Sequence, residues 1–327
     1  MHLPTLAPSL LFLHSLLPVV SAHSHIAYLI INNIHYNGYD PSPGRTTNLP
    51  NAVVWPNTAQ DDGFVPPSNY THPDIICHRD SSPAQAHAPV KAGDKIHIQW
   101  NGWPVSHRGP VMSYLASCTG LNTTDGCASV DKTALTWTKI DNSSPGFLNE
   151  TGGVPGKWAS DHLIASNNSW LVGIPHNLAP GPYVLRHEII ALHYANKKDG
   201  AQNYPNCVNL FVEPPAGKVV NVVANGGRGP VLTRTTLAPV MTGPAVVLAP
   251  GEGVKATKLY KSDDPGVSLD IYRTLTGYEI PGPTVAGWAE PVPVKSQKKV
   301  SEPLTTGTPV RVEGTRTVPF PVEKTAA

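Results

Sequence analysis

The stretches YVLRHEIIALHYA (residues 183–195) and CVNLFVE (residues 207–213) decide the fold. In both, apolar side chains recur at every second position over several residues, and a segment with Gly, Asn and Pro separates the two. Side chains of a β-strand point alternately to its two faces, so this period is typical of strands that bury one face. Each stretch therefore predicts a β-strand.

The same pattern recurs along the chain between turns that contain Gly, Pro and Asn. It is present in IAYLIINN (26–33), DKIHIQW (94–100), PVMSYLASC (110–118), SWLVGIP (169–175) and VSLDIYR (267–273). Many short strands separated by turns are typical of all-β sandwiches. We predict an all-β, immunoglobulin/fibronectin-like antiparallel β-sandwich with long loops, in which helices are limited to pieces of one or two turns.

Residues 1–22 have the organisation of a secretory signal peptide. Their apolar run, Leu10 to Val20, is too short to span a bilayer, and the small residues Val20 and Ala22 occupy the minus-three and minus-one positions of a cleavage site. Cleavage there makes His23 the first residue of a secreted, extracellular chain. The N-x-S/T sequences agree with export and are candidate glycosylation sites: Asn69, Asn122, Asn142, Asn149 and Asn167.

The composition limits the class of partner. The chain has 24 Lys and Arg against 23 Asp and Glu, so nothing indicates a nucleic acid or a membrane surface as its partner, and we expect an uncharged ligand. Charged residues make up 14% of the chain, below the roughly 25% of a typical globular domain, and Pro occurs 35 times. This composition favours short strands and long ordered loops over helices. We expect the protein to be a monomer.

The four cysteines, expected to be paired in a secreted chain, permit three pairings. Cys118 and Cys127 bracket the turn-like CTGLNTTDGC, which favours a local bond between them and leaves Cys77 to pair with Cys207. The chain contains no C-x-x-C, so a cysteine zinc site is disfavoured.

Two regions differ in amino-acid composition from the rest of the chain. Residues 214–250 combine Val with Gly and Pro and contain no polar pattern typical of catalysis, so we predict an insertion or extended loop. From residue 286 the chain is rich in Pro, Lys and Thr, and we predict a disordered C-terminal tail over 286–327. The tail contains no cysteine, which argues against a disulfide-bonded carbohydrate-binding module.

Two histidines stand out as candidate metal ligands. After cleavage His23 carries a free α-amine beside its imidazole, so one residue offers two nitrogens. His107 lies at a turn rich in Gly and Pro that leads into a strand. Three nitrogens from two such residues form a tetragonal set that suits copper(II). Taken singly, each histidine also fits an ordinary role, at a frayed terminus or in a turn.

The segment from 185 to 207 offers further candidates. It contains no H-E-x-x-H, because the histidine that follows His187 and Glu188 comes too late. Gln202 and Tyr204 are two residues apart and would share one face of a strand. Tyr204 could be a weak axial ligand, with Gln202 and His187 forming hydrogen bonds around the metal. The alternative is a half-buried strand in which Tyr and Gln satisfy each other.

Hydrolytic chemistry finds little support. A glycosidase needs two carboxyl groups facing one cleft, whereas the acidic residues here are scattered along the chain. No G-x-S-x-G occurs, so a serine-hydrolase nucleophile is not indicated.

Taken together, these stretches resemble the fungal copper-dependent lytic polysaccharide monooxygenases of auxiliary activity family nine. The resemblance keeps one order from residue 23 to residue 285, through NGYDP, GFVPPSNYTHPDIICHRD, VKAGDKIHIQW, HRGPVMSYLASC, NLAPGPYVLRHEIIALH, GAQNYPNCVNLFV and YEIPGPTV. It implies that residues 23–285 form the catalytic domain, with a flat face for the substrate. It also implies both disulfides named above.

The resemblance implies a role for each candidate. One copper ion would be held by the amine and ring of His23, by His107, and axially by Tyr204. His187 and Gln202 would surround it as catalytic partners. The family activity is oxidative cleavage of β-1,4-glucan such as cellulose, at C1 and/or C4. It requires O2 or H2O2 and an external electron donor, either a small reductant or a redox protein.

Tyr278, in the loop before IPGP, is similar to an aromatic residue on the substrate-facing surface of the family. The alternative function is a non-catalytic protein that binds copper or polysaccharide on the same scaffold.

Overall fold

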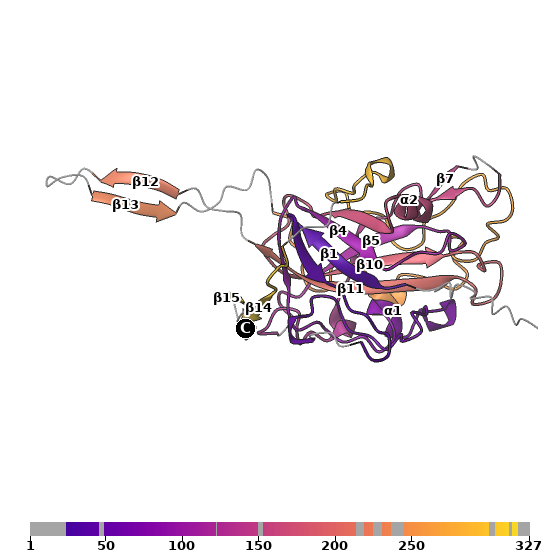
Figure 1. Ribbon diagram of the computed structural model, residues 1–327, viewed down its shortest axis with the longest axis horizontal. Helices are drawn as coiled ribbons and strands as arrows, with labels where there is room; N and C mark the ends of the chain where they lie inside the picture. The colour runs from indigo at the N-terminus through magenta and orange to yellow at the C-terminus, as the bar shows by residue number, and fades with distance from the viewer. Residues whose placement is uncertain are drawn as a thin grey trace, which may run out of the picture.

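The computed structural model describes residues 24–45, 49–121, 123–149, 153–213, 219–224, 231–236, 245–300, 305–313 and 316–319. Two β-sheets pack face to face as a sandwich (Figure 1). The first, in order across the sheet, consists of β2 (Ile34–Asn37), β1 (Ile26–Ile31), β4 (Lys95–Trp100) and β9 (Ser169–Gly173). The second consists of β3 (Ala88–Lys91), β11 (Gln202–Glu213), β10 (Gly181–Ala191), β5 (Val111–Ser117) and β6 (Thr138–Asp141).

Neighbouring strands in both sheets are antiparallel, except that β3 runs parallel to β11 at one edge. The predicted all-β antiparallel sandwich is confirmed, and the two stretches that opened the sequence analysis form the hairpin β10–β11 at the centre of the larger sheet.

Shorter elements occupy the loops. The helices are α1 (Asp74–Cys77) and α2 (Ala159–Ala165), and there are 3-10 turns at Leu49–Asn51, Pro67–Asn69, Lys132–Ala134, Ala256–Lys258 and Val294–Ser296. Three further strand pairs are β7 (Phe147–Asn149) with β8 (Lys157–Trp158), β12 (Val219–Ala224) with β13 (Val231–Thr236), and β14 (Val310–Glu313) with β15 (Arg316–Pro319). Within the part of the chain that the structure describes, none of the helices has the length and apolar character needed to cross a membrane.

The interior of the sandwich follows from the period of two. Leu29 and Ile31 of β1 lie in one buried cluster with Leu185 and Ile189 of β10. Full burial of such a side chain contributes about 1.5–3 kcal/mol, so this cluster is a main source of stability. Ile189 is paired with Tyr204 of β11, which places the Tyr204 ring on the same interior face.

The opposite face of the five-stranded sheet is buried as well. Ile75 and Ile76 of α1 and Tyr260 of a C-terminal loop cover it. Arg186 and Glu188, which an exposed strand face would present to water, are therefore 0% exposed and form a two-pronged ion pair at 2.8 Å for each prong. Because both faces are covered, β10 is buried over most of its length.

The stretch 267–273 was predicted to be a strand, and this prediction is wrong. Val267 and Ile271 are buried, but the amides of Val267 and Ser268 both donate to the carbonyl oxygen of Asp264 in a turn. The segment packs in the cluster on the outer face of the five-stranded sheet. Its apolar period of two therefore reflects burial on a sheet face and not pairing with another strand.

Both predicted disulfide bonds are confirmed. Cys77 of α1 is bonded to Cys207 of β11, and Cys118 is bonded to Cys127 across the short loop. The first closes a span of 130 residues and ties α1 to the face of the larger sheet that it covers. On a chain-entropy model, a loop of this length is worth about 4–5 kcal/mol.

The tail predicted to be disordered from residue 286 is instead packed against the sandwich where it is described. Over 286–300, Gln297 lies against the edge strand β9. The amide of Leu171 donates to Gln297 Oε1 (2.6 Å), and Gln297 Nε2 donates to the Leu171 carbonyl oxygen (3.1 Å). A sheet edge presents unpaired backbone groups, and here a side-chain amide satisfies them. Composition alone does not reveal such a partner.

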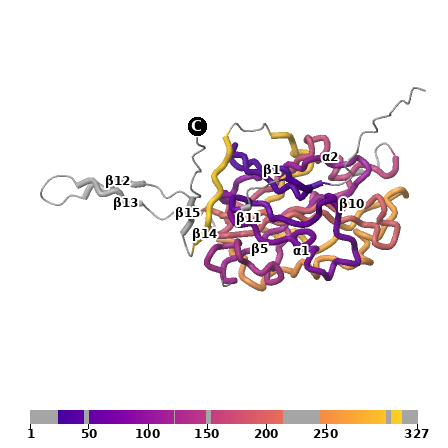
Figure 2. The backbone as a smooth tube through the Cα atoms, turned by 60° about the horizontal axis from the view of Figure 1, so that its bottom comes forward, coloured from indigo at the N-terminus to yellow at the C-terminus, as the bar shows by residue number. Residues whose placement is uncertain are grey.

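Residues 305–313 continue the tail along one end of the body (Figure 2). The amide of Gly307 donates to the carbonyl oxygen of His35 in β2 (2.6 Å). Val310 exchanges two backbone hydrogen bonds with His87, at 2.8 and 2.9 Å, just before β3. The segment thus links the edge strands of the two sheets.

The predicted insertion at 214–250 contains the hairpin β12–β13, which lies to one side of the sandwich in Figure 1. Among the described strands, these two pair only with each other. The signal peptide and His23 lie outside the described residues.

Candidate metal centre

The predicted site lies at the end of the sandwich where several strands begin or end. β10 ends at Ala191 and β11 begins at Gln202, and these two residues are paired across the hairpin. β4 ends at Trp100, and Trp103 in the loop that follows packs edge-on against Tyr204, with ring centroids 5.0 Å apart. The loop after β4, a strand of the four-stranded sheet, therefore packs against the β10–β11 hairpin of the five-stranded sheet.

His107 is held in this loop by contacts on several sides. Its amide donates to the Pro104 carbonyl oxygen (2.9 Å), and its own carbonyl oxygen accepts from Trp103 Nε1 (2.8 Å). Ring nitrogen Nδ1 lies 3.0 Å from Ser106 Oγ. Only 6% of the residue is exposed. The backbone and one ring nitrogen of His107 are thus fixed, which orients the imidazole.

Tyr204 and Gln202 are joined as the sequence suggested. The Tyr204 hydroxyl donates to Gln202 Oε1 at 2.9 Å, and the Tyr204 side chain is fully buried. Burial raises the pKa of the Tyr204 phenol above its ordinary value, since the anion would lose its hydration. Without a bound cation, the phenol therefore keeps its proton at neutral pH.

His193 belongs to this cluster, although sequence reasoning did not select it. Its ring centroid lies 4.0 Å from that of His107 and 4.5 Å from that of Tyr194, and 9% of the residue is exposed. A signal was present in the sequence: His193 lies near the end of the predicted strand 183–195, and Gln202 comes shortly before the next predicted strand, 207–213. Residues that flank a hairpin connection lie close together, and their chain separation hides this.

His187 is not in the cluster, which corrects the expectation that it surrounds the metal with Gln202. It lies in the middle of β10, where its Nδ1 is 3.0 Å from Ser113 Oγ and its ring is 5.8 Å from that of Trp100. It lies four positions before Ala191, the partner of Gln202, which is about 13 Å along the strand.

The environment of His187 is that of a buried structural residue. It is 0% exposed, and burial, followed by the charge of Arg186, lowers its pKa to about 3. Among the described residues its Nε2 has no hydrogen-bond partner. The ring is therefore neutral and closed off from solvent.

Tyr278 is also placed differently from the expectation. Its hydroxyl donates to the Gly266 carbonyl oxygen (2.8 Å), and its ring packs edge-on against Trp158 at 4.9 Å, so the side chain is half-buried inside its loop. These contacts suit an internal brace of the loop and not an aromatic that lies flat under a substrate.

Two other tyrosines are open to solvent. Tyr194 is 57% exposed and adjoins His193, while Tyr272 is 52% exposed. The amide of Leu269 donates to the Ala195 carbonyl oxygen (3.2 Å), which brings the loop of Tyr272 beside the turn of Tyr194. Exposed aromatic side chains next to the cluster thus exist, at positions that the sequence analysis did not name.

The remaining predicted sites are described only in part. Within the described residues, no three His, Cys, Asp or Glu side chains are grouped so as to hold a metal ion, and His23 lies outside this range. Of the candidate glycosylation sites, Asn167 is exposed, Asn69 and Asn142 are half-buried, and the side chains of Asn122 and Asn149 are not described.

Comparison with known proteins supports the resemblance. The model of the family described as Auxiliary Activity family 9 (formerly GH61) matches residues 23–234. An AA9 family lytic polysaccharide monooxygenase A of Malbranchea cinnamomea is 45% identical over 268 residues, covering 81% of this chain and 68% of that protein. Monooxygenase I of the same family from Botryotinia fuckeliana is 45% identical over 273 residues, covering 83% and 87%.

The solved structures agree. The extended catalytic domain of a Hypocrea jecorina lytic polysaccharide monooxygenase superimposes with a TM-score of 0.68 at 41% identity, covering 87% of this chain and 98% of that domain. The β-sandwich, the ordered match over most of the chain and the cluster at the strand ends lead to one conclusion. The chain belongs to auxiliary activity family 9, the lytic polysaccharide monooxygenases.

Proposed function

We propose that the protein is a secreted copper enzyme that cleaves β-1,4-glucan, such as cellulose, oxidatively at C1 and/or C4. It would use an external electron donor together with O2 or H2O2. One observation carries the proposal: His107, His193 and the Tyr204–Gln202 pair converge at one end of the sandwich. Ser24, the first described residue, is hydrogen-bonded to Asn101, which lies at the start of the loop that holds His107.

The residues fit a copper ion. His107 would bind through Nε2, because its Nδ1 is engaged by Ser106. His23 would add its amine and ring nitrogen once residues 1–22 are removed, and the phenol oxygen of Tyr204 would be a weak ligand. Nitrogen ligands of this kind suit copper in both oxidation states. Copper, when bound, supplies one-electron redox chemistry with dioxygen or peroxide.

The surrounding residues position the reactants. The hydrogen bond from the Tyr204 hydroxyl to Gln202 Oε1 fixes the direction of the phenol. Gln202 and His193 then present an amide nitrogen and an imidazole on the same side as His107, where they can donate hydrogen bonds to the oxidant and supply a proton as it is consumed. We therefore assign to His193 the role that the sequence analysis gave to His187.

The substrate is expected to lie on an exposed face. Tyr194 and Tyr272 offer aromatic surface to a sugar ring, and 24 basic against 23 acidic residues suit an uncharged polymer. Tyr rings supply large contact area at low cost in side-chain entropy. We propose these two residues, in place of Tyr278, as the aromatic contacts of a monomeric enzyme with cellulose.

The test compares the secreted protein, whose first residue is verified by intact mass, with a version that carries one extra alanine before His23. Both are loaded with copper and incubated with cellulose, with and without ascorbate. Oxidised oligosaccharides that appear only with reductant, and only for the native N-terminus, support the proposal. Release of ordinary sugars without reductant would overturn it. Binding of copper and cellulose without oxidised products would favour a non-catalytic binding protein.

A further inference from the structure

Ser24 and His25 precede β1 and are the second and third residues of the chain once residues 1–22 are removed as proposed, and both are well buried. Ser24 is 2% exposed and His25 is 8% exposed. Chain termini are normally poorly ordered unless something ties them down. The contacts of these two residues show what does so here.

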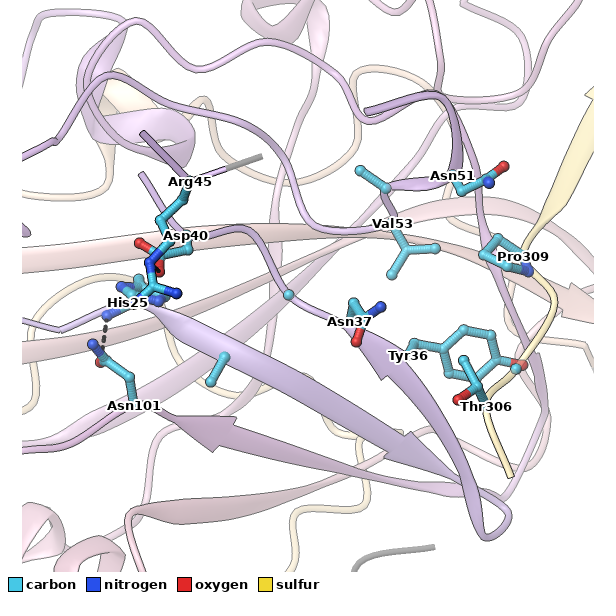
Figure 3. Close-up of a pocket in the computed structure, with 14 residues that line it drawn as sticks. His25, Tyr36, Asn37, Asp40, Arg45, Asn51, Val53, Asn101, Thr306 and Pro309 are labelled. Atoms are coloured by element: carbon cyan, nitrogen blue, oxygen red, sulfur yellow. Dashed lines mark hydrogen bonds and ion pairs between the residues drawn. The ribbon is translucent and has the colours of Figure 1, made fainter. Parts of the chain in front are cut away.

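Asn101, the residue after β4, holds both of them. Its Oδ1 accepts a hydrogen bond from Ser24 Oγ (2.5 Å) and another from the backbone amide of His25 (3.0 Å). Its own backbone amide donates to the His25 carbonyl oxygen (3.1 Å). Figure 3 shows Asn101 beside His25, joined by a hydrogen bond, where β1 begins. One residue thus engages three groups of the segment that follows His23.

Asp62 completes the arrangement from a different loop. Its Oδ1 lies 2.8 Å from His25 Nδ1, and its Oδ2 lies 3.4 Å from Asn101 Nδ2. Its backbone has a φ of 50°, in the left-handed region that Asp and Asn tolerate better than most residues, and its amide donates to the Ala59 carbonyl oxygen (2.7 Å). Hydrogen bonds therefore link Ser24 to Asn101, Asn101 to Asp62 and Asp62 to His25, and the peptide bond between Ser24 and His25 closes the ring.

We propose that Asn101, supported by Asp62, is a positioning residue for the metal centre. Neither residue contacts the metal. They fix Ser24 and His25, and through the peptide bond to residue 24 they set where the amine of His23 can lie. Consecutive Cα atoms are about 3.8 Å apart, so a displacement of residue 24 also displaces residue 23. The inference rests on the proposed function.

The test uses the full mature protein and two opposed changes. Asn101→Ala removes the acceptor for Ser24 and His25. The double variant Asn101→Asp with Asp62→Asn exchanges the two groups, so that every hydrogen bond of the ring and the net charge can be retained. Asn177→Ala is the matched control: this half-buried residue lies just before the end of β10 that is farther from Ala191. Asn101 is far from the cleavage site in sequence, so processing is unaffected.

The readouts are the copper dissociation constant by calorimetry, the Cu(II) electron paramagnetic resonance spectrum, and the thermal midpoint of the copper-free protein. Asn101→Ala should weaken copper binding by about 10–100-fold, as loss of a supporting shell does, and change the spectrum. The exchanged double variant and Asn177→Ala should stay close to wild type. If Asn101→Ala fails to fold, Ser24→Ala, which removes one hydrogen bond of the ring, takes its place with a smaller loss in the same direction.

The outcomes separate the two proposals. Equal affinity and an unchanged spectrum in folded Asn101→Ala or Ser24→Ala, beside a wild type that binds copper, would overturn the positioning role alone. A wild-type protein that binds no copper would overturn the proposed function and this inference together. An exchanged variant as weak as Asn101→Ala would also contradict it, because it would show that the hydrogen-bond ring is not what positions the terminus.

Discussion

The β10–β11 hairpin carries buried polar side chains in two places, at its middle and at its end. In the middle, Arg186 and Glu188 are fully buried on the outer face of the sheet, and their charges are matched to each other. At the end, Tyr204, which is hydrogen-bonded to Gln202, and His193, whose ring is 4.0 Å from that of His107, gather beside the loop of His107. Burial alone therefore does not mark a functional site.

Two histidines of one chain segment illustrate the difference between the middle and the end of the hairpin. His187 and His193 are six residues apart, but only His187 lies on β10, and His193 lies in the turn that follows Ala191, the last residue of that strand. His187 is 0% exposed between the two sheets, whereas His193 is 9% exposed and adjoins the exposed Tyr194. Place in the fold, and not residue type, separates a structural histidine from a candidate catalytic one. Variants in the middle of the hairpin should therefore change folding stability, whereas variants at its end should change copper binding or turnover.

The largest effect is expected from His107→Ala at the end of the hairpin. The change removes a nitrogen ligand whose orientation the backbone and Ser106 fix, so tight copper binding should be lost. Calorimetry measures the affinity, and thermal unfolding of the copper-free protein serves as the control for folding. Unchanged copper affinity would show that His107 is not a copper ligand.

Glu188→Ala should have the opposite profile. It leaves the Arg186 guanidinium buried without its carboxylate, which typically costs about 3–5 kcal/mol of folding stability. Denaturant unfolding measures this loss. The control is the double variant Arg186→Met with Glu188→Leu, which removes both charges and should recover much of the stability. A stable Glu188→Ala protein with impaired copper binding would break the distinction between middle and end.

Gln202→Ala should leave copper bound but slow the reaction. It removes the acceptor of the Tyr204 hydroxyl and a hydrogen-bond donor beside the metal, and such changes typically cost about 10–100-fold in activity. His193→Ala should behave in the same way, while His187→Ala should retain its turnover per folded molecule. Rates of oxidised product release with ascorbate measure this, and a fully active Gln202→Ala protein would contradict the assigned role.

The last effect concerns acid stability and is absent at neutral pH. Burial and Arg186 lower the pKa of His187 to about 3, while the unfolded value is about 6.5. Between these values the unfolded chain binds the proton and the folded chain does not, so stability falls as the pH drops from 6.5 towards 3. His187→Asn should reduce this fall. Unfolding midpoints at pH 7 and pH 4 measure it, and an equal fall in both proteins would contradict the lowered pKa.

The errors of the sequence analysis have different causes. The stretch 267–273 was predicted to be a strand because an apolar period of two records burial but not the element that provides it. His187 and Tyr278 carried a family likeness, yet Nδ1 of His187 lies against Ser113 inside the sheet and the Tyr278 hydroxyl is used inside its own loop. No apolar period records these contacts.

The sequence by itself indicated six of the nine strands of the two sheets (β1, β4, β5, β9, β10 and β11), favoured the observed pairing of the cysteines and offered the candidates His107, Gln202 and Tyr204. It could do so because period, turn residues and local spacing are properties of neighbouring residues. Only the tertiary structure decided which histidine stands beside His107, that the described part of the tail closes the sheet edges, and that Asn101 holds the segment after His23. These depend on hydrogen bonds and ring contacts between chain segments dozens of residues apart, which no local pattern records.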